Sequence, residues 1–190
     1  MRAVVLRDYG GFDRLRVEET EMPAVEDGVI LIRNRAFGVN HCDTDVRRGV
    51  FGIAQKFPHV MGVDSAGEVA AVGTGVQSFA VGDRVSPHFL LSCGSCRNCI
   101  AGRENICLNA GVLGVTTWGT YAEFVKVPAH SAVRLPDNIS FDDAVAASRP
   151  TSISASHAVA NGICAATASS KEMFSGKRTA LCAGTFTNSA

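Results

Sequence analysis

Four cysteines close together constrain this chain more than any other feature of its sequence. They are Cys93, Cys96, Cys99 and Cys107. Two intervening residues allow a tight turn that brings two sulfurs to one ion, and zinc accepts four thiolates in a tetrahedron with Zn–S bonds of about 2.3 Å. We therefore expect a four-thiolate zinc site. Four protein ligands leave no open coordination position, so the site is expected to be structural rather than catalytic.

Two other interpretations of the cluster are less well supported. Four free or buried thiols would not require this spacing. An iron–sulfur cluster of the bacterial ferredoxin type uses a last gap of about three residues followed by Pro, whereas here seven residues separate Cys99 from Cys107 and Leu108 follows. The chain has seven cysteines and its N-terminus does not resemble a secretory signal, which also favours metal ligands over disulfides. The remaining three, Cys42, Cys164 and Cys182, are scattered.

Composition excludes several classes of partner. Hydrophobic residues make up 46% of the 190 residues, enough for one sizeable core or for one domain and part of a second. Eighteen basic residues balance 18 acidic ones, and no long run carries one sign, so no nucleic acid or membrane partner is expected. No apolar stretch approaches the roughly 18 residues that span a bilayer. A cytoplasmic protein is the expectation.

The first 140 residues are expected to be mostly β. Strands are predicted at 3–6, 15–18, 29–37, 67–72, 83–86 and 121–127, and a short helix over 41–48 that Gly49 ends. Many short strands separated by Gly and Pro indicate a barrel or a partly open barrel.

The pattern changes after Pro136. A helix is predicted from Ser140 to about Ser148, where Arg149 and Pro150 break it. A second helix over 151–161 and a strand over 179–182 are expected to follow.

Several segments together resemble the zinc-containing medium-chain dehydrogenase/reductase family. Besides the cysteine cluster, they are Gly38-Val39-Asn40-His41-Cys42-Asp43, Gly62-Val63-Asp64-Ser65-Ala66-Gly67, Val72-Gly73-Thr74-Gly75, Val81-Gly82-Asp83-Arg84-Val85 and Gly119-Thr120-Tyr121-Ala122-Glu123-Phe124. The resemblance implies a mainly β fold with some α: a GroES-like partly open barrel over 1–140, with a zinc lobe at about 86–111. Residues 141–190 would then hold linking helices and an incomplete start of a Rossmann nucleotide-binding domain. A small-molecule substrate and a homodimer are also implied.

Alcohol dehydrogenases of this family hold a second, catalytic zinc, and its ligands are missing here. In those enzymes the first ligand is a Cys, and Asn40 stands in its position here. The second ligand is a His, and Val63, followed by Asp64, stands in its position. A shifted site that uses His41, Cys42 or Asp64 is the alternative, but zinc needs about three protein ligands.

The loss of that zinc favours reduction over alcohol oxidation. Oxidation needs an alkoxide, which zinc supplies as a Lewis acid. A quinone or conjugated carbonyl is already electrophilic, so hydride from NAD(P)H can add with hydrogen-bond help alone.

The segment from Asn40 resembles the zinc-free quinone oxidoreductases. By this resemblance Asn40 donates to the substrate carbonyl, His41 contacts the cofactor pyrophosphate, Cys42 stands at a relay position, and Asp43 joins the catalytic group. Structural roles are the alternatives: a turn for Asn40, solvation for His41, a small apolar residue for Cys42, and for Asp43 a helix cap or a pair with Arg47.

The nucleotide site is the weakest part of the pattern. Gly184 is the single glycine in the candidate fingerprint at 183–189, and no discriminating residue follows. An NAD(P)H-dependent oxidoreductase with structural zinc is the first hypothesis, and a zinc-dependent alcohol dehydrogenase the second. The others are a non-enzymatic zinc-stabilised barrel, either a remnant or an interaction module, and a thiol-based redox or metal sensor that uses the cysteine cluster.

Overall fold

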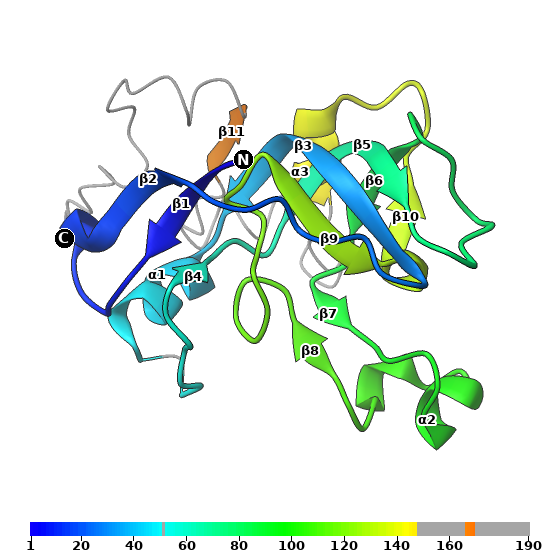
Figure 1. The fold of residues 1–190 in the computed structure, drawn as a ribbon, viewed down its shortest axis with the longest axis horizontal. Coiled ribbons are helices and arrows are strands. Elements are labelled where there is room, and N and C mark those ends of the chain that lie inside the picture. Colours follow the sequence, from blue (N-terminus) through cyan, green and yellow to red (C-terminus); the bar gives the residue numbers. More distant parts are fainter. Residues whose placement is uncertain (51, 148–165, 170–190) are drawn as a thin grey trace, which may run out of the picture.

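Three sheets make up most of the computed structural model, which describes residues 1–50, 52–147 and 166–169 (Figure 1). The strands are β1 (Arg2–Leu6), β2 (Leu15–Glu19), β3 (Val29–Val39), β4 (His59–Val60), β5 (Ser65–Val72), β6 (Arg84–Pro87), β7 (Leu90–Leu91), β8 (Gly111–Val112), β9 (Phe124–Pro128), β10 (Ala132–Arg134) and β11 (Ala166–Ser169). The helices are α1 (His41–Arg48), α2 (Arg97–Ile100) and α3 (Phe141–Ala147), with 3-10 turns η1 (Phe12–Arg14), η2 (Glu104–Ile106) and η3 (Ala129–Ser131).

The longest strand, β3, organises the fold. It pairs with β5 along one edge, and its other edge pairs first with β9 and then with β11. Its side chains contribute to all three apolar clusters of buried residues. Ile30 and Ile32 belong to one cluster, Ala36 belongs to a second, and Phe37 belongs to the third. Both ends of β3 are covered on both faces and are apolar, whereas in the middle Arg33 and Arg35 are exposed on one face.

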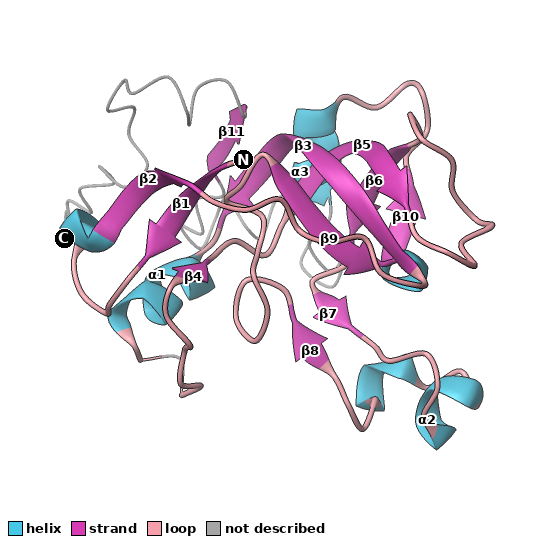
Figure 2. Ribbon diagram, in the orientation of Figure 1, coloured by secondary structure: helices cyan, strands magenta, loops and turns pink. Residues whose placement is uncertain are grey.

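A smaller sheet, in the order β2-β1-β4, packs beside the large one. The two are joined where Val4 N–H donates to the Tyr121 carbonyl at 2.8 Å and where Ala3 bridges Ala122. Strands dominate and helices are few (Figure 2). This is the mainly β, partly open GroES-like architecture that the sequence predicts.

Three glycines from three loops meet backbone to backbone near this junction. A Cβ placed on Gly119 would lie 2.2 Å from the Gly62 carbonyl oxygen and 2.5 Å from the Gly114 Cα. The Gly119 N–H also donates to the Val60 carbonyl at 2.7 Å. Only residues without a side chain allow these segments to approach so closely.

Most of the predicted elements are observed. The five strands predicted at 3–6, 15–18, 29–37, 67–72 and 83–86 are present, the last shifted by one residue, and α1 has the predicted bounds, with Gly49 left-handed (φ 74°) at its end. α3 begins one residue after Ser140, whose Oγ accepts the Asp143 N–H at 3.1 Å.

The strand predicted at 121–127 starts later, at Phe124. The carbonyls of Thr120 and Ala122 accept hydrogen bonds from the buried Asn34 side chain at 3.0 and 2.8 Å. The same segment is bonded to β1, where Ala122 bridges Ala3 and the Glu123 N–H donates to the Arg2 carbonyl at 3.0 Å.

Other elements were not predicted or cannot be compared. The short strands β4, β7, β8 and β10 were not predicted, and β11 lies where no element was expected. The helix predicted at 151–161 and the strand predicted at 179–182 lie outside the described residues. In the part of the chain that is described, no helix is both long and apolar enough to cross a membrane.

Candidate functional site

The cysteine cluster lies in a lobe that extends from the sheets. The two-stranded pair β7 and β8 forms its base, and α2 lies beyond this pair (Figure 1). In the chain, α2 and η2 come between the two strands. Cys93 follows β7, Cys96 is the N-cap of α2, Cys99 lies within α2, and Cys107 ends η2. Three short segments thus supply the four thiols, two of them from α2 and its N-cap.

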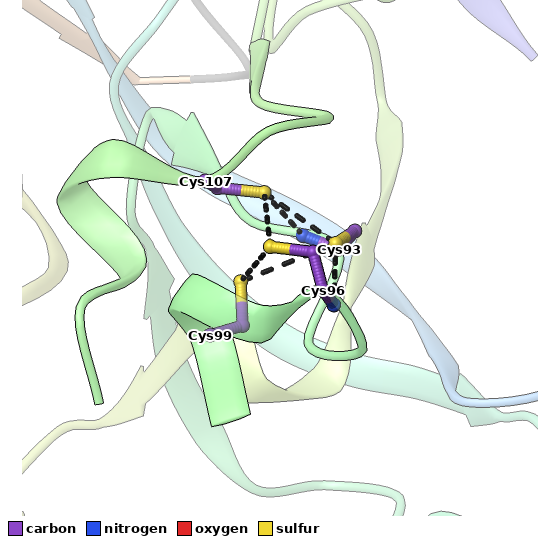
Figure 3. A group of neighbouring side chains, drawn as sticks. All are labelled: Cys93, Cys96, Cys99 and Cys107. Atoms are coloured by element: carbon purple, nitrogen blue, oxygen red, sulfur yellow. Dashed lines mark hydrogen bonds between the residues drawn. The ribbon is translucent and has the colours of Figure 1, made fainter. Parts of the chain in front are cut away.

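The four sulfurs point toward one another (Figure 3) and all lie within 4.8 Å of one another. The Cys96–Cys99 and Cys93–Cys107 Sγ distances are 3.5 Å, and Cys93–Cys99 and Cys96–Cys107 are 4.0 Å. A zinc tetrahedron with Zn–S bonds of about 2.3 Å has sulfur–sulfur edges of about 3.8 Å. The cluster therefore has the dimensions of a four-thiolate zinc site.

Backbone N–H groups are directed at these sulfurs. Cys93 N–H donates to the Cys107 sulfur at 3.3 Å, Cys96 N–H to the Cys93 sulfur at 3.4 Å, and Asn109 N–H to the Cys107 sulfur at 3.3 Å. Such hydrogen bonds favour thiolates: backbone donors, those of Ser95 and Cys96 first, hold the pKa of Cys93 well below its ordinary value. The loop thus supplies outer-shell support for negatively charged sulfurs.

A second group of polar residues surrounds the start of α1. Asn40 is the N-cap, and the Asp43 carboxylate turns back to accept the Asn40 N–H at 2.7 Å. Asp43 also accepts the Tyr121 hydroxyl at 2.8 Å and is only 4% exposed. Asp43 therefore ties the helix start to the segment before β9, as in a capping box.

These contacts favour the structural role of Asp43. Burial raises the pKa of its carboxyl to about 6, even though the hydrogen bonds from Asn40 and Tyr121 lower it. The other structural alternative was an ion pair between Asp43 and Arg47. The Arg47 guanidinium instead donates to the Gly10 carbonyl and lies 4.3 Å from the centre of the Phe12 ring.

The Asn40 side chain faces Asp64. Its Nδ2 donates to the Asp64 Oδ2 at 2.7 Å, which joins the N-cap to the loop before β5. Asn40 is half-buried, so its amide is neither withdrawn into the core nor freely solvated. Val63, which the sequence resemblance aligns with the second metal ligand of the alcohol dehydrogenases, is buried in the apolar cluster with Phe37 and Val46.

Cys42 and His41 occupy contrasting environments. Cys42 packs at the edge of the same apolar cluster, and burial, with the charges of Asp43 and Asp64, raises the pKa of its thiol to about 12. This packing favours the role of a small apolar residue, and the raised pKa shows that the thiol is not an activated thiolate. The His41 side chain is 82% exposed, with its Nε2 3.7 Å from an Asp45 carboxylate oxygen.

The alternative of a shifted catalytic metal site finds no support in this geometry. Within residues 1–50, 52–147 and 166–169, the four cysteines are the one group of three or more His, Cys, Asp or Glu side chains placed to share an ion. His41 points into solvent, whereas Cys42 packs against the core.

Sequence reasoning gave no role to two residues of this region. Tyr121 bonds to Asp43, and the buried Thr120 donates its hydroxyl to the Asp64 backbone carbonyl at 3.1 Å. Both belong to the Gly119–Phe124 segment, so that motif was the available signal. Gly184, the other predicted cofactor contact, lies outside the described residues.

Comparison with known proteins decides the family. Residues 26–137 match the family described as the alcohol dehydrogenase GroES-like domain. The chain belongs to this family. The match lies within the predicted barrel domain and includes the cysteine lobe, so this GroES-like domain is of the medium-chain dehydrogenase/reductase type, as the motifs indicate.

Relatives of this GroES-like domain are dehydrogenases. An alcohol dehydrogenase of Geobacillus stearothermophilus is 36% identical over 145 residues, covering 76% of this chain and 42% of the relative. An L-threonine 3-dehydrogenase of Aeromonas salmonicida is 44% identical over 126 residues, covering 63% of this chain and 36% of the relative. The structure of a thermostable alcohol dehydrogenase from Pyrobaculum aerophilum superimposes with a TM-score of 0.71 at 35% identity, covering 78% of this chain and 44% of the dehydrogenase. The chain thus spans about two fifths of the length of these relatives.

Proposed function

We propose that this chain is the catalytic GroES-like part of an NAD(P)H-dependent oxidoreductase that reduces quinones or conjugated carbonyls without a catalytic zinc. One observation carries the proposal: Asn40 and Val63 stand where the alcohol dehydrogenases of the family place metal ligands, and the Asn40 amide is bonded to Asp64. An amide and an isopropyl group do not make a zinc site.

Asn40 is the group proposed to act on the substrate. NAD(P)H, when bound, supplies a hydride. The role of Asn40 is to donate a hydrogen bond from Nδ2 to the substrate carbonyl oxygen, where negative charge develops as the conjugated system accepts two electrons. Water then supplies the proton that completes the reduced product. A donor fixed before the reaction needs no reorganisation while that charge forms.

His41 is the described residue proposed to face the cofactor. Its exposed imidazole at the start of α1 is accessible to an anionic group such as a pyrophosphate. The four cysteines are proposed to hold a structural zinc, because their spacing and their N–H···S contacts suit four thiolates.

The names of the relatives favour a second candidate, a zinc-dependent alcohol dehydrogenase. The double substitution Asn40→Cys and Val63→His restores the ligand types of that activity. Under our proposal, metal analysis finds about one zinc in the wild type and about two in this variant. Two zinc ions in the wild type would support the alcohol dehydrogenase instead.

The first experiment is an NADPH titration of the purified chain, followed by an assay of quinone and enone reduction. Because removal of one preorganised donor costs roughly 100-fold or more in rate, Asn40→Ala should lower kcat by about that factor. Asn138→Ala, at an exposed turn, is the matched control and should retain the wild-type rate. Absence of NADPH binding at millimolar concentration would show that this chain by itself is not a self-sufficient oxidoreductase.

A further inference from the structure

We propose that Asp64 is a positioning residue that fixes the orientation of the Asn40 amide, so that one N–H of this amide remains directed at a neutral carbonyl substrate. The substrate part rests on the proposed function. The orienting contact between the two side chains does not depend on it.

The contact determines which way the amide points. The Asn40 Nδ2 and the Asp64 Oδ2 are 2.7 Å apart, and Asp64 is only 6% exposed. The ionised form of a carboxyl can only accept hydrogen bonds, so in that form of Asp64 the amide presents its nitrogen to Asp64 and its oxygen elsewhere. The flipped amide would place two acceptors against each other at the same distance.

Asp64 is itself held in place. Its backbone carbonyl accepts hydrogen bonds from the Gly38 N–H and from the Thr120 hydroxyl, each at 3.1 Å. A Cβ at Gly38 would lie 3.3 Å from the Asp64 Cβ, so β3 passes directly against this residue. Asp64 is therefore a fixed acceptor, and Asn40, at the N-cap of α1, conforms to it.

The remaining hydrogen-bonding capacity of Asn40 suits a carbonyl substrate. A primary amide has two N–H groups, and the bond to Asp64 uses one of them. The other can donate to an uncharged carbonyl oxygen, as the proposed reaction requires.

The charge around Asn40 adds selectivity. The Asp43 and Asp64 carboxyls both lie against this residue. A substrate with its own carboxylate beside the carbonyl would bring a further negative charge into this corner. Repulsion between like charges then disfavours such anions relative to neutral quinones and enones.

The orienting contact can be tested by NMR without any turnover. In the ¹⁵N-labelled full chain, one side-chain N–H of Asn40 should exchange with solvent markedly more slowly than the other. Asp64→Asn, an isosteric change, should abolish this difference because an amide partner permits both orientations. Asp45→Asn removes a nearby charge that does not touch Asn40, and is expected to preserve it.

Two NMR results would overturn the inference. One is equal, rapid exchange with solvent of both side-chain amide protons of Asn40 in the wild type. This measurement does not depend on whether the Asp64 variant folds. The other is an unchanged exchange difference in a folded Asp64→Asn variant.

The substrate part is tested with cyclohexanone, a saturated carbonyl compound that does not alkylate thiols. Its addition should shift the remaining Asn40 N–H signal, and Asp64→Asn should weaken binding by roughly fivefold, the value of one hydrogen bond. Equal affinity in both proteins would overturn the role of Asp64 in substrate binding. If the exchange difference is present but cyclohexanone does not bind, the proposed function fails while the orienting contact stands.

Discussion

At the scale of single residues, Asp43 shows how burial and hydrogen bonding oppose each other. Its carboxyl accepts the Asn40 N–H and the Tyr121 hydroxyl, which favour the charged form. Removal from water favours the neutral form and prevails, so the pKa is about 6. A carboxyl with a raised pKa binds its proton more tightly in the folded than in the unfolded chain.

This difference makes stability depend on pH in a defined window. The contribution of Asp43 is fully present below its unfolded pKa of about 4, and is lost as the pH rises through about 6. The contribution of Asp43 to the free energy of unfolding is roughly 3 kcal/mol. Asp43→Asn cannot ionise, so the free energy of unfolding, measured by urea titration from pH 4 to pH 7, should lose this component.

The control for this prediction is Asp137→Asn, at an exposed turn before α3. It should keep the wild-type dependence on pH. An Asp43→Asn variant with the same slope as the wild type would show that Asp43 is not the group responsible.

At the scale of elements, the lobe between β7 and β8 depends on its cysteines. Cys99 is buried, yet Ile100, Ile106 and Leu108 are exposed, so the lobe has little apolar core. A small unit of this kind generally needs a metal or disulfides to hold its shape. Metal-binding free energy would then be folding free energy for the lobe.

Replacing one ligand should therefore loosen the lobe and spare the sheets. Cys96→Ser is expected to weaken zinc binding by about 100-fold or more and to speed amide exchange over 92–109. Metal analysis and hydrogen exchange by mass spectrometry measure both effects. Cys42→Ser, outside the cluster, should keep the zinc, and full zinc content in Cys96→Ser would remove the site assignment.

At the scale of the whole molecule, the junction of the two sheets depends on close contacts between loops. Gly62, Gly114 and Gly119 leave no space for a side chain where their backbones meet. The same loops carry Asp64 and Tyr121, which hold the start of α1. Packing at the junction and geometry at the candidate site are therefore coupled.

A single methyl group at this junction should destabilise the entire fold. In Gly119→Ala the Cβ would meet three backbone atoms within 2.5 Å, so the loops must separate, at a cost of roughly 2–4 kcal/mol in the free energy of unfolding. Gly111→Ala, whose Cβ would meet no atom closer than 3.3 Å, should cost much less. Equal unfolding midpoints for the two variants in urea would contradict this view of the junction.

The sequence by itself determined the features that depend on local spacing. The cysteine spacing indicated a four-thiolate site, short apolar runs between turn residues located the main strands, and Gly49 marked the end of α1. The motifs around Asn40 and Val63 indicated the family and led to the prediction that its catalytic metal ligands are absent. Each of these signals lies within a few residues along the chain, where backbone geometry sets what is possible.

Only the tertiary structure decided how distant segments use these residues. Asn40 and Asp64 are 24 positions apart, and Asp43 and Tyr121 are 78 apart, so no local pattern could pair them. The later start of β9 has the same origin, because the residues before Phe124 are bonded to β1 and to the Asn34 side chain, both distant in the sequence. Burial, which sets the protonation of Asp43 and Cys42, arises only when the sheets and loops have packed.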